Sequence, residues 1–518
     1  MKKKYNMLQI GGENYQYLFS EYDEVQWVFQ PFTSLADIDE IKEKLKRYKA
    51  FDFVFVQASY SEALIQVFRL VSSPYNTYVD QQYWNAAFKA EDIVREKMIR
   101  PFSYESNTER IEKLLSLAFS GQYGDHISPS TAIVSHSFKG EYYHKGKHTL
   151  VMTGDFGDDF QPILSWKMYL YNDKNKVNQF WAEYTTTDNV EISYTLRLYE
   201  GANMEGLKST YILEGDLLKR PFNIPLKNYD AYILVTAKAK GKGQLTIGNI
   251  HKRWTRLEFG EFILGGQRFS DDVREELIYY FDPGDLKPPL NVYFSGYRTA
   301  EGFEGFYMMR KLGAPFLLFA DPRLEGGGFY LGNDLYENQI KKIIQEMLQW
   351  LGFQENDLIL SGLSMGSFAA LYYGVQLNTT AIIVGKPLVN VGKIAGNMRL
   401  IRPEDFGTAL DVLLKNENAI DANAINRLDN KFWHTLNHSD FSDTIFAISY
   451  MENDDYDLDA FHDLLPVLSR HHARVMSRSI PGRHNDDTDA ITNWFANFYH
   501  MILESRFGRV RHESKQSI

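Results

Sequence analysis

Between residues 262 and 510, apolar residues gather in short uninterrupted runs that alternate with amphipathic segments. Such runs are typical of parallel strands that helices cover on both faces. The pattern predicts strands at 290–294, 316–320, 357–360, 381–384, 444–450 and 474–480. It predicts helices at 333–351, 367–373, 458–471 and 486–505. This part of the chain is therefore expected to be an α/β domain with a mostly parallel sheet.

The stretch from 130 to 258 has a different pattern, with short alternating segments rich in Tyr, Thr, Val and Trp. Turn residues such as Gly154-Asp155 and Gly241-Lys242-Gly243 separate these segments. Short strands at this spacing predict an antiparallel β-sandwich. The expected strands are 131–136, 147–153, 164–172, 179–185, 190–199, 231–239 and 243–250.

Residues 1–125 alternate strand-like and helix-like pieces, which predicts a small α/β layer domain. The expected strands are 25–29 and 51–57, and the expected helices are 37–48, 61–71, 80–98 and 108–119. No phosphate-binding glycine motif follows a strand here, so nothing favours nucleotide binding.

The pentapeptide Gly362-Leu363-Ser364-Met365-Gly366 lies between a predicted strand and a predicted helix. A G-x-S-x-G motif in this context is typical of a nucleophile elbow, a turn so tight that glycine is favoured on both sides of the serine. The helix that follows directs its N-terminus at the same point, so the backbone N–H of Met365 can donate to an oxyanion. We interpret Ser364 as a candidate nucleophile; the alternative is a structural turn without chemistry.

A serine nucleophile needs a base and an orienting acid, each at the carboxyl end of a later strand. His484 is the candidate base, because the segment PGRHN (481–485) lies directly between the strand at 474–480 and the last helix.

The acid is expected in the segment MENDD (451–455), which follows the strand at 444–450. Asp454 is favoured for its reach beyond the strand end, Glu452 is the main alternative and Asp455 is a further one. The chain order serine, acid, histidine is that of the α/β-hydrolase fold.

A second oxyanion donor is expected in the loop after the strand at 290–294, from the backbone N–H of Tyr297 or Arg298. Residues 386–443 form a long polar insertion with helical segments at 403–415 and 419–426, and an insertion at this place is typical of a cap over the site.

These patterns divide the chain into three expected domains. They are a small α/β domain (1–128), a carbohydrate-binding-module-like β-sandwich (129–260) and an α/β-hydrolase domain (261–512) with its cap insertion (386–443).

Composition excludes several classes of function. The net charge of −11 and the lack of a basic run beyond Lys2-Lys3-Lys4 argue against nucleic acid as a partner. The absence of cysteine excludes disulfides, thiolate metal sites and cysteine nucleophiles. No signal peptide, membrane span or metal site is predicted, and we expect a cytoplasmic protein. No bound cofactor is predicted, and the sequence does not identify an acyl donor.

The segments LNVYFSGYR, GLSMGS, MENDD and PGRHN, behind a β-rich middle region, resemble a known family. It is the acetyltransferase-like accessory Sec family of the serine-rich-repeat adhesin export pathway in Gram-positive cocci, within the α/β-hydrolase superfamily. The resemblance covers essentially the full length. It implies O-acetylation of N-acetylglucosamine on these glycoprotein adhesins before or during export. It assigns nucleophile, acid and base to Ser364, Asp454 and His484, and because the family associates a Glu with the acid, Glu452 stays an alternative.

The resemblance also implies partners: two other accessory Sec proteins, the serine-rich-repeat glycoprotein substrate and the accessory translocase motor. Contact with the motor implies a peripheral position at the inner face of the cell membrane. Two other functions compete with acetyl transfer. One is a carbohydrate esterase or deacetylase with the same triad, and the other is a non-catalytic scaffold of the export complex.

Overall fold

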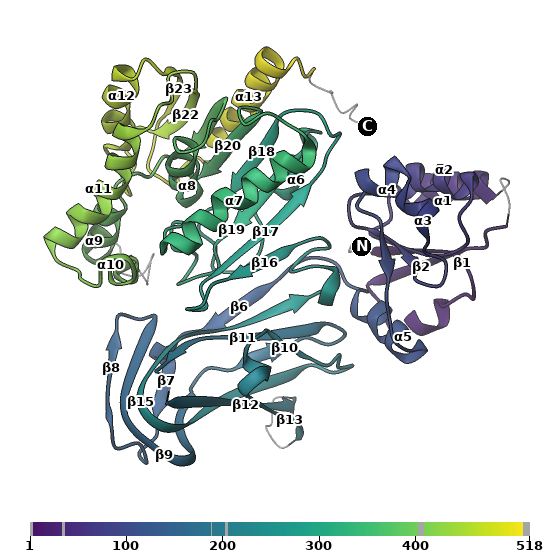
Figure 1. The fold of residues 1–518 in the computed structure, drawn as a ribbon, viewed down its shortest axis with the longest axis horizontal. Coiled ribbons are helices and arrows are strands. Elements are labelled where there is room, and N and C mark those ends of the chain that lie inside the picture. Colours follow the sequence, from purple (N-terminus) through teal and green to yellow (C-terminus); the bar gives the residue numbers. More distant parts are fainter. Residues whose placement is uncertain (1–3, 34–36, 188, 202–205, 402–408, 511–518) are drawn as a thin grey trace.

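The computed structural model describes residues 4–33, 37–187, 189–201, 206–401 and 409–510. In this part of the chain it is a mixed α/β protein with three β-sheets, one after another along the sequence (Figure 1). The architecture is consistent with an α/β-hydrolase-like part in the C-terminal half.

The first sheet has five parallel strands in the order β2-β1-β3-β4-β5. Its strands are β1 (Tyr5–Gly11), β2 (Val25–Gln30), β3 (Phe53–Gln57), β4 (Thr77–Asp80) and β5 (Arg100–Phe102). Its helices are α1 (Asp37–Tyr48), α2 (Glu62–Val71), α3 (Ala86–Lys89), α4 (Asp92–Glu96) and α5 (Asn107–Ser116). Helices cover both faces, because Leu8 and Val54 pack in one apolar cluster with α2 while Met7 and Phe53 pack in another with α5.

The single helix predicted at 80–98 is wrong. Instead β4 ends at Asp80, whose buried carboxylate accepts hydrogen bonds from Gln57 Nε2 (2.9 Å) and Tyr104 Oη (2.7 Å). The chain then turns, and the side chain of Asn85 caps the short helix α3. The predicted segment is therefore divided into a turn and the two short helices α3 and α4.

The middle sheet has ten strands, and all its strand pairs are antiparallel. They are β6 (Gly124–Ile127), β7 (Ala132–Val134), β8 (Glu141–Lys145), β9 (Thr149–Trp166), β10 (Leu170–Asn172), β11 (Val177–Thr186), β12 (Val190–Glu200), β13 (Leu207–Glu214), β14 (Phe222–Ile224) and β15 (Ala231–Thr255). Strand β6 lies inside the range predicted as the first domain but pairs with β15, so a division after residue 128 separates β6 from its own sheet.

Two long strands replace several of the predicted short ones. The segments predicted as separate strands at 231–239 and 243–250 are one strand, β15, and the expected turn at Gly154-Asp155 lies within β9. The ladder between β9 and β15 has register shifts near Gly157 and Gly241, which have φ values of 90° and 92°. Glycine adopts such values without steric cost, so these residues produce bulges that bend the strands rather than end them.

The third sheet has eight strands in the order β16-β17-β19-β18-β20-β21-β22-β23. They are β16 (Gln267–Ser270), β17 (Glu276–Asp282), β18 (Leu290–Phe294), β19 (Phe316–Ala320), β20 (Leu358–Leu363), β21 (Ala381–Gly385), β22 (Ile445–Met451) and β23 (Arg474–Ile480). Strands β16 and β17, which the sequence did not predict, are antiparallel to their neighbours, and the remaining pairs are parallel.

Helices cover both faces of this sheet as well. The helices are α6 (Phe306–Lys311), α7 (Asp334–Leu351), α8 (Met365–Gly374), α12 (Ala460–Arg470) and α13 (Thr488–Phe507). Apolar residues of α7, α8 and α12 join one cluster with the strands, and those of α6 and α13 join another.

The connection from β21 to β22 carries the helical insertion. It holds α9 (Val391–Ile401), α10 (Ala409–Glu417) and α11 (Ala422–His438), which pack against one another. Part of the helix predicted at 403–415 lies outside the described residues, and the segment predicted at 419–426 belongs to the longer α11.

Candidate active site

Ser364 occupies a strained turn between β20 and α8. Its backbone has φ 52° and ψ −122°, a left-handed region that residues other than glycine rarely adopt. A Cβ on Gly362 would lie 2.2 Å from the carbonyl oxygen of Gly366, and one on Gly366 would lie 2.0 Å from that of Phe294. Both glycines of the motif are therefore required by close backbone contacts.

His484 and Asp454 lie in line with this serine. Ser364 Oγ is 2.8 Å from His484 Nε2, and His484 Nδ1 is 2.7 Å from Asp454 Oδ2. The three residues follow the carboxyl ends of β20, β22 and β23. His484 is 1% exposed and Asp454 is 4% exposed, so both hydrogen bonds are shielded from bulk water.

The loop after β22 fixes the acid and the imidazole. Asp454 Oδ1 accepts hydrogen bonds from the backbone N–H of Tyr456 (2.9 Å) and Asp457 (3.3 Å). The Tyr456 ring stacks on the His484 ring with centroids 4.2 Å apart and an angle of 9°. The backbone N–H of His484 donates to Asp455 Oδ1 at 3.2 Å. Asp455 thus orients the backbone of the histidine, while the carboxylate of Asp454 meets its ring.

Glu452, the alternative acid, is not brought to the histidine. It is exposed and accepts a hydrogen bond from Ser479 Oγ of the neighbouring strand β23 at 2.5 Å. Strand β22 continues to Met451, one residue beyond the predicted end, so Glu452 is still held beside β23.

Of the three predicted oxyanion donors, two line the pocket of Ser364 and one does not. Met365 is the first residue of α8, and it lines the pocket of Ser364 together with Tyr297. Arg298 instead directs its backbone N–H to the carbonyl of Gly326 (3.4 Å) and its guanidinium to the carbonyls of Ala300 and Phe303. The structure therefore groups Met365 and Tyr297 with the serine and places Arg298 outside this pocket.

The pocket around Ser364 has a volume of about 370 Å³. One wall is apolar and includes Ile394 and Met398 of α9, so the insertion contributes directly to the pocket. Such a cavity, mostly apolar with a few polar groups, is typical of small-molecule sites.

Lys386 is a buried cation in this pocket that the sequence analysis missed. It follows β21 at φ 53°, is 6% exposed, and its Nζ lies 3.5 Å from Thr488 Oγ1. Burial lowers the pKa of the Lys386 ammonium below its ordinary value, while the carboxylates of Asp454 and Glu304 act in the opposite direction. The sequence could have indicated Lys386 as a site residue only through its position at the carboxyl end of a predicted parallel strand.

Within the described residues, one group of side chains has the arrangement of metal ligands. His126 of β6, His251 of β15 and Glu301 of the loop after β18 place donor atoms within 4.8 Å of one another. Arg253 donates from Nε to Glu301 at 2.5 Å, and the same carboxylate lies 2.6 Å from His251 Nδ1. A guanidinium beside the shared carboxylate disfavours a cation there, so this group fits a buried ion-pair network better than a metal site.

No helix in the described ranges is long and apolar enough to span a lipid bilayer.

Comparisons with known proteins match this chain, over nearly its whole length, to accessory Sec system proteins. Residues 5–509 match the family described as Accessory Sec system GspB-transporter. The chain is 51% identical over 523 residues to an accessory Sec system protein of Staphylococcus aureus (strain NCTC 8325 / PS 47), covering 100% of both chains. It is 39% identical over 515 residues to an accessory Sec system protein of Streptococcus gordonii, covering 98% of this chain and 100% of that one.

Among solved structures, the Glycosylation Associate Protein (Gap123) complex from Streptococcus agalactiae contains a similar chain. The TM-score is 0.88 at 33% identity, covering 98% of this chain and 100% of that chain. The accessory Sec relationship expected from the motifs is confirmed, and the chain belongs to the Accessory Sec system GspB-transporter family.

Proposed function

We propose that this accessory Sec system protein is a serine-dependent O-acetyltransferase that acts on N-acetylglucosamine of serine-rich-repeat glycoprotein adhesins and supports their export. The observation that carries the proposal is the hydrogen-bonded chain Ser364 Oγ–His484–Asp454 at the floor of a pocket. The strand order of the third sheet, with the three residues after β20, β22 and β23, supports an α/β-hydrolase fold for this part.

In the proposed first step, Ser364 Oγ attacks the acyl carbonyl of the donor while His484 Nε2 takes the hydroxyl proton. Asp454 holds the Nδ1 proton, which leaves Nε2 free to accept, and stabilises the imidazolium that forms. The backbone N–H groups of Met365 and Tyr297 stabilise the oxyanion. The leaving group departs with the proton from His484, and the acetyl group remains on Ser364.

In the second step, a hydroxyl of the sugar gives its proton to His484 and attacks the acetyl ester. The ester bond to Ser364 breaks, and the proton returns to Oγ. Transfer requires that the sugar hydroxyl reach the ester before water does. The apolar wall from α9 favours this outcome because its Ile394 and Met398 side chains offer no hydrogen-bond partner to a water molecule beside the ester.

We also propose that the protein works in an assembly with two other accessory Sec proteins and contacts the accessory translocase motor from the cytoplasmic side of the membrane. Support comes from the similar chain in the Gap123 complex, a multi-protein assembly.

The deciding experiment co-expresses the glycosylated adhesin with wild-type protein or Ser364→Ala and measures its acetyl content by mass spectrometry. Acetylated N-acetylglucosamine should appear with the wild type and disappear with the variant. Equal acetylation would refute the role of Ser364, and more acetyl with the variant would identify an esterase. Export of the adhesin, measured in the same cells, tests a scaffold role separately.

A further inference from the structure

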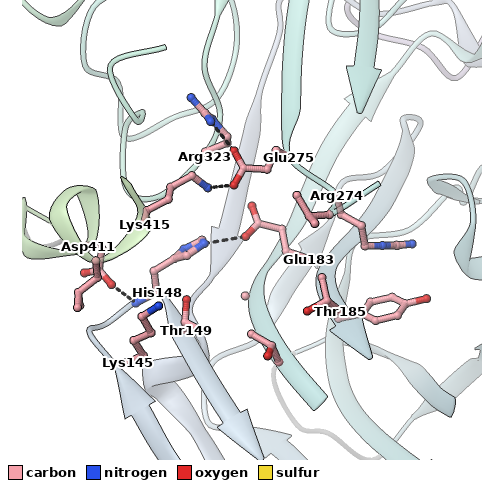
Figure 2. Close-up of a pocket in the computed structure, with 15 residues that line it drawn as sticks. Lys145, His148, Thr149, Glu183, Thr185, Arg274, Glu275, Arg323, Asp411 and Lys415 are labelled. Carbon is pink, nitrogen blue, oxygen red and sulfur yellow. Dashed lines mark hydrogen bonds and ion pairs between the residues drawn. The ribbon is translucent and has the colours of Figure 1, made fainter. Parts of the chain in front are cut away.

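A second cavity, of about 220 Å³, lies where the middle sheet meets the insertion and the loops of the third sheet. Figure 2 shows side chains around it from the β8–β9 hairpin, β11, the loop before β17, the loop after β19 and α10, and strand β15 lines it as well. None of its lining residues lines the pocket of Ser364. It is therefore a separate site.

The β8–β9 hairpin is tied directly to α10. Asp411 of α10 accepts hydrogen bonds from the backbone N–H groups of Lys147 (3.2 Å) and His148 (2.9 Å). A Cβ on Gly146 would lie 2.2 Å from Asp411 Oδ1, so the hairpin needs glycine to approach so closely. These contacts join two walls of the cavity into a fixed frame.

Each of the three acidic side chains of the cavity already has partners within the protein, and Asp411 uses the backbone N–H groups of the hairpin. Glu275 lies between Lys415 and Arg323, with its Oε2 2.5 Å from Arg323 Nη1 (Figure 2). Glu183 lies 2.9 Å from His148 Nε2 and 2.9 Å from His251 Nε2. Because Glu275 is paired with two cations and the other two carboxylates already hold hydrogen-bond partners, the cavity offers little net attraction for a further cation.

Several polar groups remain without protein partners. Within the described ranges, the hydroxyls of Thr149, Thr185 and Thr246 make no side-chain hydrogen bond, and Lys145 makes no ion pair. His148 is 8% exposed, and its buried Nδ1 has no hydrogen-bond partner there. Hydroxyl groups both donate and accept, so a ligand that complements them carries several hydroxyls of its own.

We propose that this cavity binds one neutral sugar residue, a hexose or N-acetylhexosamine, of a glycosylated substrate. The volume is below the 300–1,000 Å³ of drug-sized sites, which suits a single ring rather than an oligosaccharide. The threonine hydroxyls and the unpartnered Nδ1 of His148 suit the several hydroxyls of a neutral polyol, to one of which Lys145 can donate. The proposal rests on the proposed function only for the source of the sugar.

The insertion that lines this cavity also lines the pocket of Ser364. Helix α10 packs against α9, and α9 supplies Ile394 and Met398 to the pocket of Ser364. A sugar held here lies on the same insertion that covers the nucleophile. It provides a second attachment point for a glycosylated chain whose acceptor sugar lies at Ser364.

Titration of the full-length chain with N-acetylglucosamine, followed by ligand-observed NMR, tests the proposal. A Ser364→Phe background is used because the large side chain occupies the other pocket, so that the signal reports on the cavity. Thr185→Val combined with Thr246→Val removes two hydroxyls with little change of shape, and the dissociation constant should rise about tenfold. Thr186→Val makes the same exchange at the next residue of β11, which is exposed and does not line the cavity, and it should change nothing.

Thermal unfolding of each variant verifies that it is folded. Absence of saturable binding, or an unchanged dissociation constant in the double variant, would refute the sugar site. Displacement of the sugar by inorganic phosphate would also refute it, because the site would then be an anion site. Loss of the acetylation role with sugar binding intact would refute the proposed function and leave the cavity assignment standing.

Discussion

Replacement of Asp454 by asparagine tests the arrangement of the candidate triad with a minimal change of shape. The carboxylate is 4% exposed and holds His484 Nδ1 at 2.7 Å through Oδ2. Its Oδ1 accepts two backbone N–H groups, from Tyr456 and Asp457, and the carbonyl oxygen of the introduced amide would keep both. The amide would then direct its NH₂ group at Nδ1, so the loop should remain folded while the hydrogen bond to the histidine is reversed.

The reversed hydrogen bond at His484 Nδ1 determines how much activity is lost. With an amide donor facing it, Nδ1 must accept, so Nε2 carries the proton and cannot take one from Ser364 Oγ 2.8 Å away. The wrong tautomer lowers the rate of serine attack by about 10⁴-fold in enzymes with such a triad, which corresponds to about 5 kcal/mol in the activation free energy. We expect a loss of about 10³- to 10⁴-fold here, somewhat less than the loss of about 3 × 10⁴-fold for removing the acid of such a triad.

The assay is the rate of Ser364 acylation by p-nitrophenyl acetate, with fluorophosphonate labelling as a second readout. Glu452→Gln is the matched control, because it makes the same change of charge two residues away on a side chain that contacts Ser479 instead. The control should keep the wild-type rate within about twofold. Equal losses in both variants, or a loss in Glu452→Gln alone, would show that the acid has been misassigned.

Three further predictions concern stability. Gly366→Ala should lower the unfolding free energy by more than about 1 kcal/mol, measured by urea unfolding, because its Cβ would lie 2.0 Å from the carbonyl oxygen of Phe294. Arg253→Met should cost about 3–5 kcal/mol in the same assay, since it removes the cation that two buried carboxylates, Glu276 and Glu301, share. Burial alone would lower the pKa of His251, but Glu301 and its other partners raise it to about 9 from 6.5. The stability from His251 should therefore be present below pH 6.5 and lost as pH rises toward 9, a trend absent in His251→Gln when melting temperatures are compared.

The regular part of the third sheet was predictable because both of its faces are buried. Strands β18 and β19 have the predicted bounds, since helix-covered parallel strands leave uninterrupted apolar runs. Strand β23 also has the predicted bounds, although it is a partly exposed strand at the sheet edge. Strand β16 was not predictable in this way: three of the four residues in its sequence QRFS are polar, and it pairs only with β17 at the sheet edge. In the middle sheet, glycines that commonly end strands instead bend them, and only the pairing partner decides between these outcomes.

The candidate site was predictable where local sequence positions it. Ser364 and His484 each lie in a short strand-to-helix connection, so chain order alone placed them. The choice between Asp454 and Glu452 depended on where β22 ends, a boundary that sequence fixes only to within a few residues. Lys386 was missed because its significance comes from burial beside residues distant in the chain.

The insertion connects these observations. Its helix α9 forms the apolar wall beside Ser364, while its helix α10 is held by the β8–β9 hairpin through Asp411. The position of α9 therefore depends on a contact made by the middle sheet, far from the nucleophile in sequence. If transfer rather than hydrolysis requires that wall to exclude water, then the middle sheet contributes to the choice of acceptor without touching the reacting atoms. Weakening the hairpin contact, for example with Asp411→Ala, should shift the products from acetylated sugar toward free acetate while Ser364 is still acylated, whereas an unchanged ratio would show that the wall is positioned by the third sheet alone.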